Sequence, residues 1–349
     1  MSLIELAPEE YQPKAPPVAA SYGIGIVGAG GIVRGAHLPA YRAFGYRVAG
    51  VCDISEHALE QIRAGFDVPF LTTEIDALLE RDDVHIIDLA VHASQRRPLV
   101  EKIVKAGKPI LSQKPFALTF EDAKYMVDLC GEAGVPLMIN QQARWAPSHR
   151  AVKILIDRGV VGHVYSIVHV NRSFQDVPGT WYVALKNFNI VDHGIHYIDL
   201  SRFFSGRTPV RVKATTTMVP GQAAVSPMIY TILCEYEPQA QLMATLHFNN
   251  IVKASTAHDY AWYIDGTEGS IRASHSEIVV SRADEPHRTH IFKVQGRWFP
   301  DAFGGSMGEM MRALSEKREP ETSGRDNLNS IKMAEAAVKS SETGEAVAL

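Results

Sequence analysis

The sequence predicts an α/β protein of two domains, with a doubly wound parallel sheet followed by a large, open, mainly antiparallel sheet. The length of 349 residues suggests two domains. Short apolar runs alternate with helix-like segments in the first part, and longer β-branched and aromatic stretches dominate the second. We expect an N-terminal extension at 1–22, a first domain at 23–145 and a second at 146–349. A helical segment at 301–341 should pack back on the body.

Composition excludes several classes of protein. With 46% hydrophobic and 21% charged residues, the chain can bury a core and is not disordered. A formal charge of −4 gives no basic field for nucleic acid. No apolar run is long enough for a membrane span, and no signal peptide is evident. The widely spaced Cys52, Cys130 and Cys234 predict neither disulfides nor a metal site, and they favour a cytoplasmic location.

The first domain shows alternating strands and helices. Turn residues bound five short apolar runs, which are Gly23–Val27, Tyr46–Cys52, His85–Val91, Pro109–Leu111 and Pro136–Ile139. Helical spacing follows at Arg97–Ala106 and Phe120–Gly131, where Thr119 is a candidate cap and Gly107 and Gly134 are candidate stops. Because such strands join through right-handed crossovers, this region predicts a parallel sheet.

After residue 150 the pattern becomes that of an antiparallel sheet. One helix is expected at Ser148–Arg158. Strands are expected at Tyr165–Val170, Val210–Met218, Met228–Tyr236, Gln241–Phe248 and Tyr260–Asp265. The proline-containing residues 1–22 are expected to form an arm outside the core.

A glycine turn after the first strand indicates a dinucleotide site. Gly28 permits the tight turn, and Gly30 lets the backbone approach a pyrophosphate at the start of the next helix, with Gly31 and Ile32 beside it. The sixth position of the fingerprint is Val33 instead of glycine. The alternative is a glycine turn in a nucleotide-free α/β domain.

A carboxylate at the end of the second strand favours NAD over NADP. Asp53 lies 25 residues after Gly28, where it can accept both hydroxyls of a ribose and repel a 2′-phosphate. No arginine follows it directly in Ile54-Ser55-Glu56.

Two further groups lie where a doubly wound sheet exposes catalytic residues. Lys114 follows the fourth apolar run, at the carboxyl edge of the predicted sheet, although a lysine in this position, taken alone, is more often a solvated loop residue. In a helix, Asp192, His196 and Asp199 would share one face, and a carboxylate beside a histidine orients it for proton transfer. A structural His–Asp pair is the alternative at that segment.

These motifs together resemble the Gfo/Idh/MocA oxidoreductases, from about Gly23 to Leu349. The resemblance rests on the order and spacing of several segments, which are the glycine turn with His37-Leu38-Pro39-Ala40, Ala106-Gly107-Lys108-Pro109 running to Lys114-Pro115, Arg144-Trp145 with Pro147, Gly159-Val160-Val161-Gly162, Asp192-x-Gly-Ile-His196-x-x-Asp199, Gly266-Thr-Glu-Gly-Ser270 and Ser340-Ser-Glu-Thr-Gly-Glu-Ala-Val347. It implies a Rossmann domain and a C-terminal α/β domain whose sheet forms a dimer or tetramer interface.

The resemblance also implies roles for individual residues. Lys114, Asp192 and His196 match the family's catalytic set, with the histidine as acid/base. Residues expected beside the cofactor are Val91, His92, Gln113, Lys114 and Asn140. Apart from the resemblance, candidate substrate residues are Arg144, Trp145, Asn171, Arg172 and Trp181, because Trp or Arg faces can cover a sugar ring; plain packing is the alternative for each of them. The chain departs from the family at Gln113 (usually Glu), at His92 (usually Pro) and at Asn187-Phe188-Asn189, which replaces a glycine-rich segment.

The resulting functional hypothesis is hydride transfer between NAD and a secondary alcohol of a sugar, polyol or derivative. Two alternatives stay open. Some relatives are glycosidases that use bound NAD without net oxidation, and the same fold also serves as a nucleotide-sensing regulator. The presence of Lys114, Asp192 and His196 disfavours the regulator, because a sensor needs no base.

Overall fold

A computed structural model describes residues 4–349 of the chain, which divide into two compact units. The parallel-sheet unit comprises residues 13–146 and 297–328. The large-sheet unit comprises residues 4–12, 147–296 and 329–349. The division at Ala146/Pro147 lies next to the predicted boundary, but each unit also takes segments from the far end of the chain.

The parallel-sheet unit contains a six-stranded sheet in the order β3-β2-β1-β4-β5-β6, and every pairing in it is parallel. Its strands are β1 (Gly23–Val27), β2 (Arg47–Cys52), β3 (Leu71–Thr72), β4 (Ile86–Leu89), β5 (Ile110–Gln113) and β6 (Leu137–Asn140). The predicted doubly wound sheet is confirmed. The sequence does not single out β3, because two residues give no periodicity.

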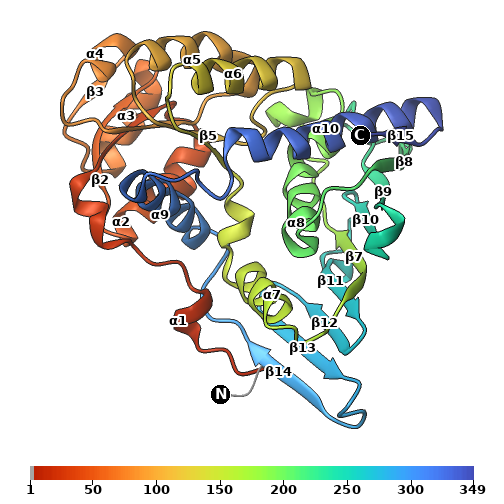
Figure 1. The fold of residues 1–349 in the computed structure, drawn as a ribbon. Helices are drawn as coiled ribbons and strands as arrows, with labels where there is room; N and C mark the ends of the chain where they lie inside the picture. The colour runs from red at the N-terminus through yellow and green to blue at the C-terminus, as the bar shows by residue number, and fades with distance from the viewer. Residues whose placement is uncertain (1–3) are drawn as a thin grey trace. The chain divides into compact units, whose positions relative to one another are not determined.

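Helices cover both faces of this sheet. They are α2 (Leu38–Ala43), α3 (Glu56–Gly65), α4 (Ile75–Leu79), α5 (Arg96–Lys105), α6 (Phe120–Glu132) and α9 (Asp301–Glu316). In Figure 1, α5 and α6 run side by side on one face, and α2 and α9 pack on the other. The predicted cap of α6 is confirmed, since the Thr119 hydroxyl accepts the Asp122 N–H at 3.2 Å.

Helix α9 belongs to the core of this unit. Phe303, Met307 and Met310 are fully buried in the same cluster as Ile24 and Ile26 of β1. The helix therefore shields one face of the parallel sheet, although it follows the large sheet in the chain. Sequence order places it with the second domain, and contacts place it with the first.

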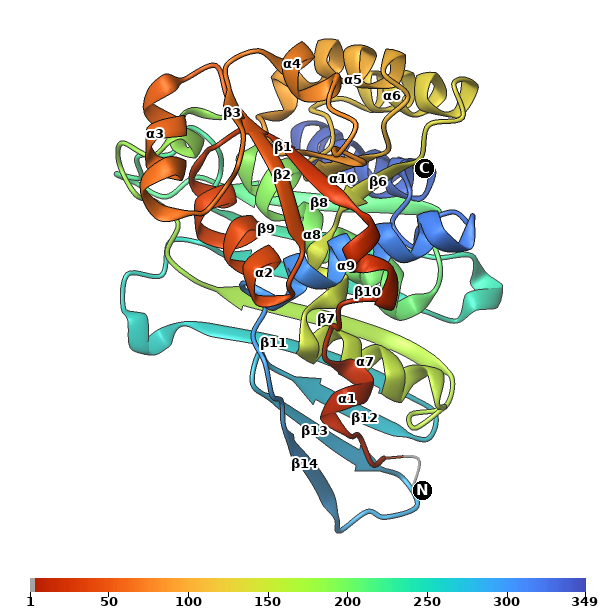
Figure 2. The ribbon, with the colours of Figure 1, turned by 90° about the vertical axis from the view of Figure 1, so that its left-hand side faces the viewer.

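The large-sheet unit is built on a nine-stranded sheet in the order β14-β13-β12-β11-β7-β10-β9-β8-β15. Its strands are β7 (Val164–Arg172), β8 (Arg211–Thr217), β9 (Ile229–Glu235), β10 (Met243–Asn249), β11 (Asp259–Gly266), β12 (Gly269–Ala273), β13 (Glu277–Arg282), β14 (Thr289–Lys293) and β15 (Val347–Ala348). Within this sheet, as far as the structure describes it, only β7 and β10 pair in parallel, so the predicted mainly antiparallel sheet is confirmed. Figure 2 shows β11 to β14 succeeding one another as hairpins.

Helices α7 (Pro147–Asp157), α8 (Ile195–Ser205) and α10 (Gly324–Thr343) complete the long helices. Helix α8 packs on β7 and β10, and α7 packs on α8, β12 and β13. Short turns are α1 (Pro8–Tyr11), η1 (Pro17–Ser21), η2 (Val33–His37), η3 (Ala93–Gln95), η4 (Gln142–Trp145), η5 (Trp181–Ala184), η6 (Asn189–His193), η7 (Pro238–Ala240) and η8 (Ser255–Ala257). Of these, η2 and η6 are π-helical.

The expectation that residues 1–22 lie outside the core is wrong for the part that the structure describes, and residues 1–3 lie outside that part. Tyr11 is buried, and its hydroxyl accepts the Gln295 N–H at 3.2 Å within the large-sheet unit. Ala19 joins the core cluster of the parallel-sheet unit. Pro8 and Pro17 begin the helical turns α1 and η1, and the segment lies against folded structure instead of forming a detached arm.

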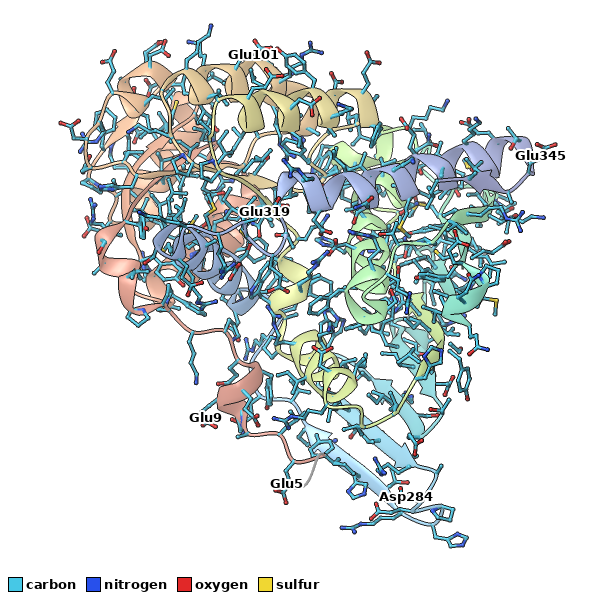
Figure 3. All side chains as sticks on the ribbon, in the orientation of Figure 1. Glu5, Glu9, Glu101, Asp284, Glu319 and Glu345 are labelled. Carbon is cyan, nitrogen blue, oxygen red and sulfur yellow. The ribbon has the colours of Figure 1, made fainter. Side chains whose placement is uncertain are left out.

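Charged side chains lie mainly at the surface, as the six labelled carboxylates of Figure 3 illustrate. Asp284 lies in the turn between β13 and β14, where Arg282 donates to both of its oxygens at 2.8 Å. Within residues 4–349, no helix is long and apolar enough to cross a membrane.

Candidate active site

The glycine turn lies at the carboxyl end of β1. Gly28 has φ +105°, and a Cβ there would lie 3.0 Å from the Ala90 carbonyl group, so both the conformation and the close approach require glycine. Gly30 and Gly31 are exposed, and a Cβ on either would meet no atom within 4 Å. The backbone of the turn is therefore open to a ligand, as a pyrophosphate would need.

Asp53 is fixed against this turn. One carboxylate oxygen accepts the Ala29 N–H at 2.6 Å, and the other accepts the Ser55 N–H at 2.8 Å. The residue directly follows β2, at the carboxyl edge of the sheet. The expected position of Asp53 at the end of the second strand is confirmed, and the structure adds that two backbone donors hold its carboxylate beside the glycine turn.

Two arginines at this edge are not singled out by the sequence. Arg34 donates to the Ala29 carbonyl at 2.8 Å and so brings a positive charge to the turn. Arg96, which is 2% exposed, donates to the Val91 carbonyl at 2.8 and 3.1 Å and also to the Pro115 carbonyl. Arg96 therefore ties the turn after β4 to the turn after β5. A basic residue soon after the glycines could have indicated Arg34, but no local pattern distinguishes a buried arginine such as Arg96.

The ends of β5 and β6 present amide side chains. Gln113 and Asn140 are register partners on these two strands, and both are buried. The Gln113 carbonyl oxygen accepts the backbone N–H of the half-exposed Lys114 at 2.9 Å. Neither side-chain polar atom of Asn140 has a hydrogen-bond partner among residues 4–349. The same holds for Gln141, an amide that the sequence does not single out.

The turn before α8 presents the proposed dyad. Asp192 lies in the π-turn η6, and His196 lies in the first turn of α8, where it is 8% exposed. The i, i+4 spacing was predicted for a regular helix, and the π-turn changes that register. Such π-turns are frequent at functional sites.

Asp199, the third acid of the segment, is used within the fold. It is fully buried, accepts the Ser330 hydroxyl at 3.0 Å and lies 3.8 Å from the Arg202 guanidinium. Arg202 also donates to Ser330 at 3.0 Å. These bonds fasten α8 to α10, so Asp199 is occupied structurally, whereas Asp192 is half-exposed.

The candidate substrate residues lie in different settings. Arg144 pairs with Asp326 at 2.9 Å, and Trp145 is buried in the core cluster of the parallel-sheet unit. In the large-sheet unit, Asn171 is buried and Arg172 donates to the Ala257 carbonyl at 3.2 Å. Trp181 is 51% exposed and packs edge-on against Tyr182 and Phe188. Trp181 is therefore the one of these side chains with most of its surface open to a ligand.

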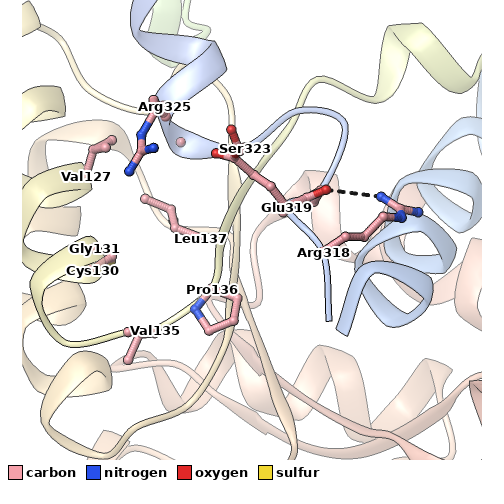
Figure 4. Close-up of a pocket in the computed structure, with 13 residues that line it drawn as sticks. Val127, Cys130, Gly131, Val135, Pro136, Leu137, Arg318, Glu319, Ser323 and Arg325 are labelled. Atoms are coloured by element: carbon pink, nitrogen blue, oxygen red, sulfur yellow. Dashed lines mark hydrogen bonds between the residues drawn. The ribbon is translucent and has the colours of Figure 1, made fainter. Parts of the chain in front are cut away.

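A pocket of about 250 Å³ lies elsewhere in the parallel-sheet unit. Figure 4 shows it lined by Val135 and Leu137 at the amino end of β6, and by Arg318 and Ser323. Ligands of doubly wound sheets bind at the carboxyl edge, which is the opposite end of the strand. This pocket is therefore not the site that the glycine turn indicates.

The three cysteines are poor candidates for a nucleophile. Cys52, Cys130 and Cys234 are buried free thiols, and burial raises their pKa values to about 11, 12 and 12. Thiols with such pKa values are poor nucleophiles at neutral pH. Within residues 4–349, no three His, Cys, Asp or Glu side chains are grouped to hold a metal ion.

Comparison with known proteins identifies both parts of the chain. Residues 22–141 match the family model described as an oxidoreductase family with an NAD-binding Rossmann fold. Residues 149–272 match the GFO/IDH/MocA C-terminal domain. The C-terminal match covers the π-turn, α8 and the strands from β7 to β11.

Individual relatives match over almost the whole length. A D-apiose dehydrogenase of Paraburkholderia graminis is 30% identical over 324 residues, which cover 90% of this chain and 86% of the relative. An inositol 2-dehydrogenase of Rhizobium meliloti is 24% identical and covers 84% of this chain and 89% of its own. A crystal structure of an Agrobacterium radiobacter oxidoreductase in complex with NAD+, L-tartaric acid and magnesium superposes with a TM-score of 0.84 and 26% identity, over 94% of this chain and 98% of that one. Together with the glycine turn and the segment from Asp192 to His196, these matches show that the chain belongs to the GFO/IDH/MocA oxidoreductase family.

Proposed function

We propose that the protein is an NAD-dependent dehydrogenase that oxidises a secondary alcohol of a sugar or polyol to a carbonyl. The observation that carries this proposal is the π-turn that presents Asp192 just before His196 on α8, in a family of oxidoreductases. Relatives named as D-apiose and inositol 2-dehydrogenases support a polyhydroxylated substrate. NADP is disfavoured, because Asp53 would face its 2′-phosphate.

The residues at the carboxyl edge of the parallel sheet fit NAD. Open backbone at Gly30 and Gly31 suits the pyrophosphate, and Ile32 continues that turn into the helix. The buried amide of Asn140 has donors and an acceptor to offer the nicotinamide carboxamide. Gln113, Val91 and the exposed His92 border the same edge and complete the proposed cofactor residues.

The proposed reaction removes a hydride from the alcohol carbon and a proton from the hydroxyl group. Bound NAD would supply the acceptor for the hydride that leaves the alcohol carbon. His196 accepts the hydroxyl proton, and Asp192 orients the imidazole and stabilises its protonated form. The Lys114 ammonium donates a hydrogen bond to the reacting oxygen and stabilises its developing negative charge. In the reductive direction, His196 returns the proton to the oxygen.

The candidate substrate residues are proposed to have different roles. Trp181 offers an exposed aromatic face, on which the apolar face of a sugar ring can pack. Asn171 and Arg172, at the end of β7, are proposed to contact hydroxyl groups. The ion pair of Arg144 with Asp326 and the burial of Trp145 support a role in shaping the site more than direct contact with substrate.

A homo-oligomer is proposed through the open face of the nine-stranded sheet. Helices α7 and α8 cover one face, and the other carries partly exposed apolar side chains such as Val168, Val170 and Leu233. Light scattering after size exclusion tests this proposal, since a monomer would contradict it. A cytoplasmic location is also proposed, supported by the three cysteines that stay free.

The decisive experiment measures NADH absorbance while the protein is offered sugars, polyols and their acids with NAD or NADP. We expect stoichiometric NADH and oxidised product from at least one neutral sugar or polyol. Hydrolysis of a glycoside without net NADH would indicate the redox-neutral glycosidase instead. NAD binding without any turnover would indicate the sensor.

A further inference from the structure

The π-turn that presents Asp192 is closed by a backbone hydrogen bond and contains a glycine that allows close approach of the backbone. The Gly194 N–H donates to the Asn189 carbonyl at 2.7 Å, which closes an i→i+5 turn around Asp192. A Cβ on Gly194 would lie 2.8 Å from the Asn189 and Ile190 carbonyl oxygens, so the glycine is required by close approach. A π-turn has poorer intrinsic stability than an α-turn and needs support from its surroundings.

Buried asparagines provide that support. Asn250, which is fully buried, donates from Nδ2 to Oδ1 of Asn189 at 3.0 Å. Asn189, which is 1% exposed, donates from its own Nδ2 to the Pro227 carbonyl at 2.6 Å. The Ser173 hydroxyl donates to Oδ1 of Asn250 at 3.1 Å. The π-turn is thus cross-linked to the ends of β7 and β10 and to the start of β9.

The same amide also reaches the residue after Asp192. Nδ2 of Asn250 lies 3.3 Å from Nδ1 of His193, which can accept this bond as a neutral imidazole. Asn250 therefore contacts the turn at its first residue, Asn189, and at its last, His193. Asp192 lies between these two fixed points. The contacts fix the backbone around its carboxylate without touching the carboxylate itself.

We infer that Asn189 and Asn250 are positioning residues that set the orientation of Asp192, and through it that of His196. This inference rests on the proposed function, because it assumes that Asp192 acts in proton transfer. A displacement of a catalytic group by about 1 Å can lower the rate by about 100-fold. Loss of the asparagine bonds should therefore lower kcat while KM and NAD affinity change little.

The alternative hypothesis, that the two asparagines have a purely structural role, predicts different results. In that reading the asparagines only stabilise the unit, so variants would melt earlier but keep normal turnover per folded molecule. The two readings also differ in how substitutions combine. A positioning residue has no effect once the group it positions is absent, whereas losses from independent causes multiply.

The experiment compares Asn250→Ala with its neighbour Asn249→Ala in the full-length enzyme. Asn249 is the matched control because its amide accepts only a local bond, from the Ile251 N–H at 3.3 Å, among the hydrogen bonds found for it. We expect kcat to fall roughly 10- to 100-fold in Asn250→Ala and less than about twofold in Asn249→Ala. The pH profile of kcat should shift in Asn250→Ala alone, since the carboxylate no longer holds the same relation to the imidazole.

The double variant Asp192→Asn/Asn250→Ala decides between the readings. We expect it to be no slower than Asp192→Asn, within about twofold, because the position of Asp192 no longer matters. A further 10-fold loss, or an unchanged kcat in Asn250→Ala, would overturn the inference. Full activity in Asp192→Asn would instead overturn the proposed function, so the two failures are distinguishable.

Asn250→Asp covers the case in which the alanine variant does not fold. This change keeps the size and the acceptor for Ser173, but it removes the Nδ2 donor that Asn189 and His193 share. We expect the same fall in kcat and the same loss of effect in the Asp192→Asn background. Normal kcat in Asn250→Asp would contradict the inference, because the shared donor would then be dispensable.

Discussion

The two units both contain a π-turn, and the residues that surround the turn differ between them. Each has a π-turn at the start of a helix, η2 after the glycine turn of the parallel-sheet unit and η6 before α8 of the large-sheet unit. The first follows a turn that Gly28 constrains, through its positive φ and its close approach to the Ala90 carbonyl group. The second is fixed by the buried amides of Asn189 and Asn250. A constraint on backbone conformation is visible in a sequence, whereas a side-chain bond between distant residues is not.

This contrast explains what could be predicted at the site. Asp53 was located correctly, because the spacing of strand, turn and strand places the end of β2 beside the glycines. The regular helix expected for Asp192 to His196 was only partly right, since a π-turn precedes α8. One of the contacts that hold this turn comes from 61 residues away, where Asn250 bonds Asn189. No local pattern contains that information.

The fold shows the same limit. Local chemistry predicted β1 with its bounds and the Thr119 cap of α6, because each depends on neighbouring residues. The membership of α9 in the parallel-sheet unit depends on which apolar surface it covers, and Phe303 and Met307 do not reveal that from their spacing. Strands β12 to β14 were missed because polar residues and short hairpins weaken their alternation.

The largest expected effect tests the large-sheet unit as the source of proton transfer. His196→Asn keeps much of the size but removes the proton acceptor, so kcat for alcohol oxidation should fall by about 10² to 10⁴. Affinity for NAD, measured by calorimetry, should change little, because the proposed cofactor residues lie in the other unit. Asp192→Asn should give a smaller or comparable loss, and the two losses should not add.

The control for this prediction is the stability of the free protein. A structural pair would give His196→Asn a lower melting temperature with nearly normal turnover per folded molecule. A stable and fully active His196→Asn protein would remove this residue from the mechanism.

The second prediction tests the contribution of the parallel-sheet unit to the same chemistry. Lys114→Ala removes the proposed donor to the reacting oxygen, and loss of one such donor lowers kcat by roughly 10² to 10³. Lys114→Arg should rescue poorly, because a planar guanidinium replaces a compact ammonium. Lys124→Ala is the control, since Lys124 pairs with Asp128 at the surface of α6. Equal turnover in the two alanine variants would show that Lys114 is a solvated loop residue without a part in the reaction.

The third prediction tests whether the glycine turn distinguishes the two nucleotides. Asp53→Ala removes a charged acceptor for the ribose, and bonds to charged groups contribute about 1.5–3 kcal/mol, which is roughly 10- to 150-fold in affinity. The preference for NAD over NADP should narrow by about that factor, as dissociation constants for both nucleotides would show. Asp53 also accepts the Ala29 N–H. Asp53→Asn keeps one side-chain oxygen as an acceptor, so this variant should narrow the preference for NAD over NADP less than Asp53→Ala does. Tighter binding of NADP than NAD by the native protein would contradict the assignment.

The smallest expected effect concerns the buried His169 of the large-sheet unit, and the buried His37 of the parallel-sheet unit provides the comparison. In the parallel-sheet unit His37 lies 2.6 Å from the Asp88 carboxylate, with the Tyr41 hydroxyl donating to the same oxygen at 2.7 Å. In the large-sheet unit His169 instead packs against Tyr197 and Trp262, with ring centroids 4.4 and 4.3 Å away. Burial holds the pKa of His169 well below its usual value, although its bond to the Ala261 carbonyl partly opposes this shift.

The acid dependence of stability follows from that lowered pKa. Below pH ~6.5 the unfolded chain protonates His169 while the folded protein keeps it neutral, so the unfolded state binds more protons. The stabilisation is therefore complete above pH ~6.5 and is lost as the pH falls toward the folded pKa, by up to about 1.4 kcal/mol per pH unit. His169→Phe should flatten the fall in unfolding free energy between pH 6.5 and 5, measured by urea denaturation at each pH. Phe248→Leu disturbs the same aromatic cluster, whose rings contact His169, without removing a titrating group, so it should keep the native slope. An unchanged slope in His169→Phe would mean that the acid sensitivity of the large-sheet unit arises at other groups.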